Sequence, residues 1–209
     1  MRFELVSLAL ALAIDASGGC AWSHQRVHLR PTIPFARSDI AGGRSVVLRV
    51  EDERQRTEIG RRIGPGEGGA ITSDQDLASL VRGAFADALE RYGFRVASSG
   101  GTGEAALNIA LRSLEYEAAR EGISRSVHAR AAVEARCRSG ARGYENFYRE
   151  HHTRPRRSFP LAPEANEALP NEMFSGVLRQ PLADRAPLDC LAGAAGPAPA
   201  ASDRSDQTP

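Results

Sequence analysis

The sequence contains no lysine: all 27 of its basic side chains are arginines, which balance 26 acidic residues. The absence of lysine excludes a phosphate-binding P-loop, because the lysine of that loop reaches the phosphates. We attribute it to a GC-rich coding bias, since no physical demand removes lysine from every surface position. The formal net charge of +1 argues against a protein that binds nucleic acid mainly through phosphate contacts.

Long hydrophobic runs are also scarce. The apolar stretch at residues 5–14 is too short to cross a bilayer as a helix, which takes roughly 20 residues, and no second run is longer. It is typical of the apolar core of an export signal, and the small residues Ser17, Gly18 and Gly19 after it leave an unobstructed backbone for a signal peptidase. We therefore assign residues 1–19 to a signal peptide and exclude them from the fold.

Cys20 follows these small residues, at the position where a bacterial lipoprotein is acylated. We predict that Cys20 is the lipid attachment site and the membrane anchor. Ser17 stands where such signals usually carry leucine, so a secreted periplasmic protein that is not lipidated, cut after Gly19 or Ala21, is the alternative. Ala21 in place of aspartate favours the outer membrane over the inner membrane, by analogy with enteric sorting.

Cysteine is rare elsewhere, with Cys137 and Cys190 as the remaining two. Export to an oxidising compartment permits a disulfide between them, although the sequence alone does not establish it. Composition divides the mature chain into three parts. We expect a flexible tether at residues 20–43, one folded domain at 44–190, and a disordered tail rich in alanine and proline at 191–209.

The folded part begins with a strand and a helix. Residues 45–50 are a β-branched run, which indicates a buried strand, and a glycine-rich loop of about twenty residues follows. Residues 73–92 place apolar side chains at three- and four-residue steps, which predicts an amphipathic helix capped by Thr72 or Ser73. Gly93 gives that helix its left-handed stop.

The rest of the domain is predicted to be a β-meander and a closing helix. The expected strands are 94–97, 105–117, 124–138 and 144–152, and the expected helix is 164–185. The apolar parity changes near Arg112 and Ser113, which predicts a β-bulge, and Pro170 and Pro181 are expected to kink or divide the helix. This order predicts an α+β fold with helices packed on one face of a sheet.

Residues with possible chemistry are better explained by structural roles. The glycines of 64–69 fit G-x-G-x-x-G, but they lie within a loop and not between a strand and a helix, so we predict no nucleotide site. His151 and His152 are adjacent in a strand and point to opposite faces, which does not suit a shared metal. His128 lies on the expected wet face of its strand, where cross-strand polar pairing is favoured over acid–base catalysis.

Nucleophiles are not in activated positions either. No serine stands in a nucleophile elbow, and Cys137 falls on the expected buried face of its strand. Residues 154–157, Arg-Pro-Arg-Arg, could contact anionic headgroups, but a solvated loop is the simpler interpretation. We predict no catalytic residue, no cofactor and no metal.

Three short motifs carry a resemblance to a known family. They are Gly18-Gly19-Cys20, the strand Val46–Val50 running into Asp52-Glu53-Arg54, and the helix Leu77–Tyr92 ending in Gly93-Phe94-Arg95-Val96. With the meander at 107–148 and the closing helix, the chain resembles the YajG-like family of bacterial lipoproteins over about residues 44–190. The resemblance implies an envelope lipoprotein of uncharacterised function, with no catalytic residues to transfer. We expect Asp52 and Arg54 to be a fold-stabilising pair.

The sequence therefore predicts a non-enzymatic envelope lipoprotein that faces the periplasm. Its expected partners are the membrane, through the lipid at Cys20, and an envelope protein, with no nucleic acid and no nucleotide. One alternative is an accessory lipoprotein subunit of an ABC-type lipid transporter, which would need an exposed apolar groove between helix and sheet. Another is a secreted hydrolase, which would need polar residues that converge on one pocket.

Overall fold

The computed structural model describes residues 24–34, 37–62, 68–97, 105–121, 124–156 and 163–193. The predicted signal peptide, Cys20 and residues 194–209 lie outside the described residues. The elements, in chain order, are β1 (Gln25–Arg26), β2 (Ser45–Asp52), β3 (Gly60–Arg61), β4 (Ala70–Thr72), α1 (Leu77–Arg91), β5 (Arg95–Ala97), β6 (Ala105–Glu121), β7 (Ser124–Ser139), β8 (Arg142–Arg156), α2 (Pro163–Ala183) and α3 (Arg185–Ala192).

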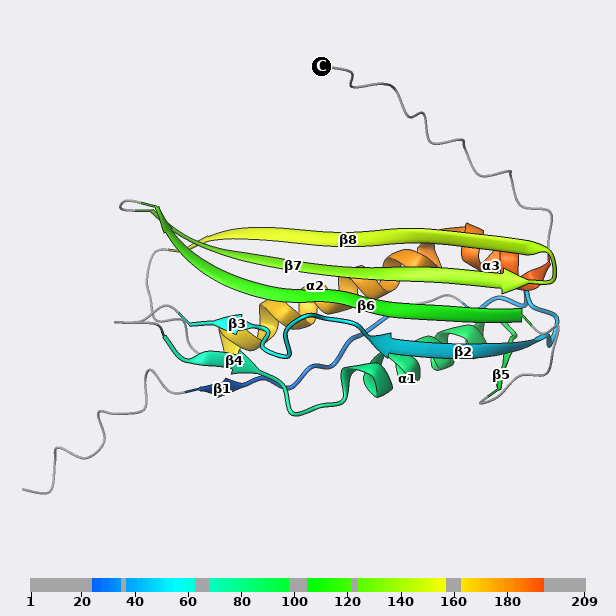
Figure 1. The fold of residues 1–209 in the computed structure, drawn as a ribbon, viewed down its shortest axis with the longest axis horizontal. Coiled ribbons are helices and arrows are strands. Elements are labelled where there is room, and N and C mark those ends of the chain that lie inside the picture. The colour runs from blue at the N-terminus through cyan, green and yellow to red at the C-terminus, as the bar shows by residue number, and fades with distance from the viewer. Residues whose placement is uncertain are drawn as a thin grey trace, which may run out of the picture.

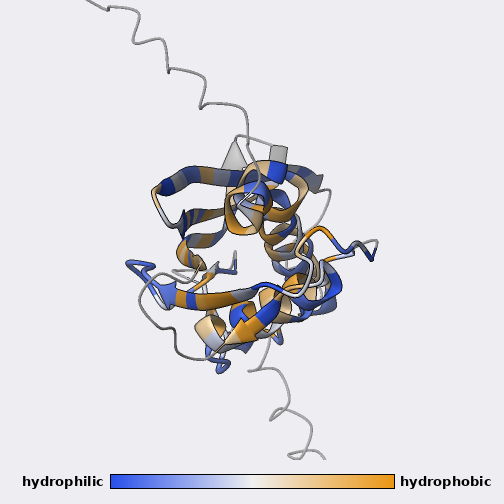
Figure 2. Ribbon diagram, turned by 90° about the vertical axis from the view of Figure 1, so that its right-hand side faces the viewer, coloured by the Kyte–Doolittle hydropathy of each residue, from blue (hydrophilic) through white to orange (hydrophobic). Residues whose placement is uncertain are grey.

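One mixed sheet forms the body of the domain, and its longest strand is β6. Strand β2 pairs in parallel with the first half of β6, the short β3 pairs in parallel with its second half, and the antiparallel β7 covers its other side. The sheet curls, and the helices α1, α2 and α3 close its open side (Figures 1 and 2). The predicted α+β fold, with helices packed against a sheet, is confirmed.

The core lies between the curled sheet and these helices. The alternation predicted for β7 is observed, because every second side chain from Val127 to Cys137 is at most 4% exposed. The register of β6 against β7 shifts between Leu111 and Ser113, where the sequence predicts a bulge. The shift turns Leu114 into the core together with Leu111, which lies on the same face despite its odd spacing.

Helix α1 begins later than predicted. Its N-cap is Asp76, whose carboxylate accepts hydrogen bonds from the backbone N–H groups of Ala78 and Ser79. Thr72 belongs to β4 instead, so the expected cap at Thr72 or Ser73 is wrong. The stop at Gly93 is confirmed, since that residue has φ +84°.

The loop before α1 contains two short strands that the sequence does not reveal. Gly60 of β3 lies so close to β6 that a Cβ atom there would be 1.8 Å from the carbonyl oxygen of Tyr116. Only glycine permits this approach. The pairing of β3 thus holds this loop against β6.

The closing helix is also corrected. Helix α2 continues through both Pro170 and Pro181 and ends at Ala183. Asp184 separates it from α3, which its carboxylate caps by accepting a hydrogen bond from the N–H of Ala186. A proline inside a helix costs about 3 kcal/mol, and each fully buried large apolar side chain returns about 1.5–3 kcal/mol. The apolar face of α2 carries enough of these to hold the helix together: Leu169, Met173, Phe174, Val177, Leu178 and Leu182.

The expected tether at residues 20–43 is wrong for the part that the structure describes. β1 pairs in parallel with β4, and Val27 and Leu29 are at most 3% exposed in the core. The apolar burial of these residues fixes the segment to the domain. At the other end, α3 runs to Ala192 and Leu191 is buried, so the domain extends past the expected boundary at residue 190.

Candidate functional site

Residues 24–34, which we call the N-terminal segment, lie along α2 as an extended chain. Backbone N–H groups of alternate residues donate hydrogen bonds to side-chain oxygens that stand four residues apart on the helix. These pairs are His28 with Glu167 at 3.2 Å, Arg30 with Asn171 at 2.6 Å, and Thr32 with Ser175 at 3.0 Å.

The spacing of these pairs follows from the geometry of the two elements. Two residues of an extended chain advance about 6.6 Å, and four residues of a helix advance about 6.0 Å. A segment that runs in the same direction as the helix can therefore keep the same contact over several steps. The helix presents a row of side chains where a sheet would present a backbone.

Two carboxamides complete this substitute for a β-ladder around Leu29. The Asn171 carboxamide accepts from the N–H of Arg30 and donates to the carbonyl of His28 at 3.0 Å, as a residue of a parallel strand would. On the other side, Gln75 accepts from the N–H of Leu29 at 2.6 Å and donates to its carbonyl at 3.0 Å. The segment is held from both sides, with Leu29 fully buried.

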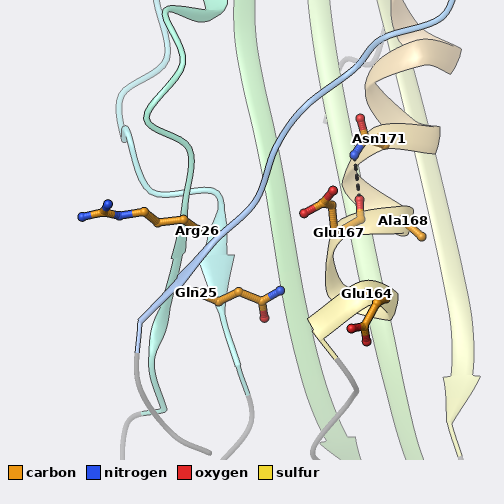
Figure 3. A pocket seen from close by; sticks show the side chains of 6 residues that line it. All are labelled: Gln25, Arg26, Glu164, Glu167, Ala168 and Asn171. Atoms are coloured by element: carbon orange, nitrogen blue, oxygen red, sulfur yellow. Dashed lines mark hydrogen bonds between the residues drawn. The ribbon is translucent and has the colours of Figure 1, made fainter. Parts of the chain in front are cut away.

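A polar hollow of about 360 Å³ lies where the N-terminal segment meets the first turns of α2 (Figure 3). Its lining residues are Gln25, Arg26, Glu164, Glu167, Ala168 and Asn171. Beside it, Gln25 accepts from Asn166 at 2.9 Å, and Asn166 in turn accepts from the Tyr116 hydroxyl at 2.7 Å. These hydrogen bonds link the N-terminal segment, α2 and the sheet beside the hollow.

The chemistry available in this hollow is limited to carboxylates, amides and one guanidinium. Arg26 reaches out of it to Asp74, in an ion pair of 3.2 Å whose two side chains are mostly exposed. Nowhere in the described residues do three or more potential metal ligands gather. The hollow therefore offers a polar attachment point and no arrangement of a nucleophile with a base.

The hollow is lined by Gln25 and Arg26, which follow Cys20 closely in the sequence. His24 is the first described residue, four positions after Cys20, and four residues of chain span at most about 14 Å. Cys20 itself, the predicted lipid attachment site, is outside the described residues, so this prediction is neither confirmed nor contradicted by the fold.

The opposite end of α2 leads to a covalent link. Cys137 of β7 and Cys190 of α3 form a disulfide, with Cα atoms 6.4 Å apart. Next to it, Asp184 accepts from the hydroxyls of Tyr144 at 2.5 Å and of Tyr148 at 2.7 Å. The sequence permits the disulfide without establishing it, whereas the tyrosine pair is not predicted at all.

Burial and these hydrogen bonds together shift the pKa values of all three groups. Burial alone would raise the pKa of Asp184, but the two tyrosine hydroxyls outweigh it and hold the pKa of that carboxyl below its usual value. Burial raises the pKa of Tyr144 and of Tyr148, and the carboxylate of Asp184 raises both further. The cluster therefore attaches β8 to the start of α3 by hydrogen bonds.

The histidines lie where the strand pattern places them. His128 is on the outer face of the sheet, within 2.9 Å of Ser126 Oγ and 3.0 Å of Thr153 Oγ1, and its ring stacks on that of His151. His152 faces the other way and contacts Glu150 at 3.2 Å. The predicted opposite orientation of the adjacent histidines and the polar pairing of His128 are confirmed.

The outer face carries an ion cluster that the sequence analysis misses. Glu134 of β7 is only 1% exposed, because Arg112 and Arg136 lie over its carboxylate. Arg112 also pairs with Glu53. Burial raises the pKa of Glu134, but the hydrogen bond from Arg112 outweighs this effect and lowers the pKa below its ordinary value.

Two further predicted motifs have structural partners. Asp52 and Arg54 form the expected pair, with two hydrogen bonds of 2.8 Å, and the Arg54 bonds lower the pKa of the Asp52 carboxyl. The solvated loop expected at residues 154–157 is wrong for the part that the structure describes, because Arg154 lies in β8 and pairs with Glu172 of α2. Of the glycine-rich motif, Gly68 and Gly69 directly precede a strand and not a helix, and residues 64–67 lie outside the described residues.

The chain is similar to several known proteins. Within the described residues no helix is long and apolar enough to cross a membrane. The sequence matches no curated protein. Among solved structures, a Xanthomonas campestris protein of family DUF330 has 15% identity and a TM-score of 0.49, with 82% of this chain and 96% of that chain covered.

Two further structures are more distant. Lipoprotein GNA1162 from Neisseria meningitidis has 11% identity and a TM-score of 0.32, with 68% of this chain and 99% of that chain covered. The PelC dodecamer from Paraburkholderia phytofirmans has 15% identity and a TM-score of 0.27, with coverages of 73% and 91%. A family model described as an uncharacterised lipoprotein matches residues 31–186. This match covers most of the chain, and the protein belongs to this family of lipoproteins, the YajG family.

Proposed function

We propose that this lipoprotein is acylated at Cys20 and that its domain faces the periplasm, with a binding or structural role that involves no catalysis. The observation that carries the proposal is the docked N-terminal segment. Its hydrogen bonds to α2 begin at Gln25, which accepts from Asn166, and continue at His28 and Arg30, so the chain that follows Cys20 joins the fold within a few residues. A lipid at Cys20 would thus hold the folded domain close to the membrane.

Docking of this segment gives the anchored domain a defined orientation. A flexible tether would let the domain move freely above the membrane, whereas about 14 Å of chain between Cys20 and His24 keeps β1 close to it. β1 lies beside β4, which pairs with β3, and β3 lies at Tyr116 near the far end of β6. We infer that this end of the sheet faces the membrane.

The disulfide and the polar clusters support the remaining parts of the proposal. The bond between Cys137 and Cys190 suits an oxidising compartment such as the periplasm. The ion cluster around Glu134 and the hydroxyl pair on Asp184 each engage neighbouring side chains of the same domain. These arrangements favour structural roles, and Ala21 favours the outer membrane.

The accessory-subunit alternative stays a prediction without a structural observation in its favour. It requires an exposed apolar groove between helix and sheet. Among the described residues, the large apolar side chains that are exposed are Ile40 and Phe147, and the polar hollow is lined by charged and amide groups.

Incorporation of labelled palmitate tests the proposal. The wild-type chain should carry the label in cells, and Cys20→Ala should carry none. Ser17→Leu, which supplies the usual leucine of a lipoprotein signal, is the matched control and should be labelled as the wild type is. Equal labelling of the wild type and Cys20→Ala would overturn the anchor. Labelling of Ser17→Leu alone would also overturn it, because Ser17 would then block processing of the natural chain.

A further inference from the structure

β8 forms a long edge of the sheet. Within the part of the chain that the structure describes, it pairs with β7 and with no other strand. Two side-chain contacts show which residues face its outer edge: Gln180 donates to the carbonyl of Arg149 at 3.1 Å, and Asn146 accepts from the N–H of Phe147 at 2.9 Å. Because backbone groups alternate in direction along a strand, the odd-numbered residues 143–153 direct their N–H and C=O groups to this edge.

The same odd-numbered residues present exposed side chains on the outer face of the sheet. Phe147 stands in the middle of this row and is 45% exposed. The guanidinium carbons of Arg112 and Arg149 lie 5.9 Å and 5.7 Å from the centre of its ring. An unpaired strand edge is a template for pairing with another strand, and Phe147 places apolar surface at the middle of this edge.

Two side chains of opposite charge flank Phe147 at equal distances along the strand. Glu145 precedes it by two residues and Arg149 follows it by two, both on the outer face and both exposed. Glu145 also pairs with Arg136 of β7 at 3.4 Å, and about half of each of these two side chains stays exposed. If a second copy of the strand ran antiparallel about a two-fold axis at Phe147, Glu145 of each copy would lie opposite Arg149 of the other. A strand with like charges at these two positions would instead repel its own copy.

We propose that the edge of β8 binds β8 of a second copy of this chain, antiparallel, about a two-fold axis at Phe147. The two sheets then continue into one, with Phe147 against Phe147 and two ion pairs between Glu145 and Arg149. The interface is isologous and closed, so it gives a dimer and not a filament. Gln180 and Asn146 hold the free backbone groups in the monomer and are displaced by the ladder. This inference does not rest on the lipid anchor.

Crosslinking of the full chain in cells tests the register. In a hydrogen-bonded antiparallel pair the two Cα atoms lie about 5.5 Å apart, within the range of a disulfide. Phe147→Cys should therefore give a covalent dimer under mild oxidation. Thr153→Cys, exposed on the same face of the same strand, is the matched control, because the two copies of residue 153 would be about 40 Å apart.

The outcomes of this experiment are distinct. A dimer of Phe147→Cys with a monomer of Thr153→Cys supports the proposal. Equal crosslinking of both variants indicates random collision and overturns it, as does a monomeric Phe147→Cys. A crosslink from residue 147 to a different protein also overturns it, because the edge then serves another partner.

Charge reversal tests the ion pairs without cysteine. Glu145→Arg and Arg149→Glu should each weaken dimerisation about tenfold, because each places like charges opposite one another at two positions. The double variant restores opposite charges and should recover the dimer, as measured by analytical ultracentrifugation in mild detergent. Single variants that dimerise as the wild type does would overturn the register, as would a double variant that does not recover.

Discussion

The N–H of Arg30 donates a hydrogen bond of 2.6 Å to Oδ1 of Asn171, across 141 positions of sequence. The same carboxamide donates to the carbonyl of His28, so one side chain of α2 engages two backbone groups of the N-terminal segment. Because of this contact, the folded domain begins near β1 and not at β2. It also makes the segment a part of the fold whose removal should have a measurable cost.

Asn171→Leu should lower the free energy of unfolding by about 1–2 kcal/mol, because both hydrogen bonds are lost at nearly constant volume. The amide of Arg30 should also exchange its hydrogen faster, which a change in global stability alone would not single out. Asn171→Asp keeps the acceptor for Arg30 and loses the donor to His28, so its effect should be smaller. An unchanged exchange rate at Arg30 in Asn171→Leu would contradict the docked segment.

The disulfide between Cys137 and Cys190 closes a loop with a sequence separation of 53. Replacing both cysteines with alanine should lower the free energy of unfolding by about 2–4 kcal/mol, because the unfolded chain gains the freedom that the link removes. Denaturant titration measures the loss. A midpoint equal to that of the wild type would show that the link does not form in the native protein.

Asp184 should give the stability a pH dependence on the acid side. Its pKa in the folded state is lowered by the tyrosine hydroxyls, so its contribution is present above the ordinary aspartate value of about 3.9 and is lost as the pH falls through the folded value. In Asp184→Asn the helix cap is kept and the charge is not. The difference in unfolding free energy between wild type and Asp184→Asn should shrink between about pH 5 and pH 2; a constant difference would contradict this role.

Tyr148 should act on the alkaline side in the opposite sense. Its pKa is raised by burial, so its contribution is present below the ordinary tyrosine value of about 10 and is lost as the pH rises through the folded value. Tyr148→Phe should therefore lose less stability than the wild type between about pH 9 and pH 11. Parallel curves for the two proteins over that range would exclude the predicted linkage.

Arg112 should be needed because Glu134 is buried. Arg112→Met leaves the carboxylate with Arg136 alone and should lower the free energy of unfolding by about 2 kcal/mol. The double variant Arg112→Met with Glu134→Leu removes the buried charge as well and should recover most of that loss. A double variant as unstable as the sum of both single variants would show that the two residues do not interact.

Local patterns were enough to predict the strands and helices that pack against neighbours in the chain. The alternation from Val127 to Cys137 and the parity change at Ser113 are properties of short windows, and both predict the observed structure. The cap at Asp76 differs from the prediction because Thr72 pairs in β4 with distant residues. A sequence window contains no information about such pairing.

The N-terminal segment shows where sequence reasoning failed and which signal was present. Its prolines and charges are typical of a linker, yet Val27, Leu29 and Ile33 fall on one parity and are all buried. The partners Gln75 and Asn171 lie far along the chain, so their role in holding the segment was not visible. The burial of Glu134 had the same cause, since Arg112 lies on another strand.

Energy transfer from the domain to the membrane tests the central claim most directly. Ala168 lines the hollow beside β1, and Ala141 lies in the turn between β7 and β8, roughly 30 Å away along the sheet. Both are exposed alanines that can be replaced by cysteine and labelled in the lipidated full chain. With acceptor dyes on the lipid headgroups, the account predicts clearly stronger transfer from position 168 than from position 141. Equal transfer from both positions, or stronger transfer from 141, would contradict a domain held at the membrane by its docked N-terminal segment.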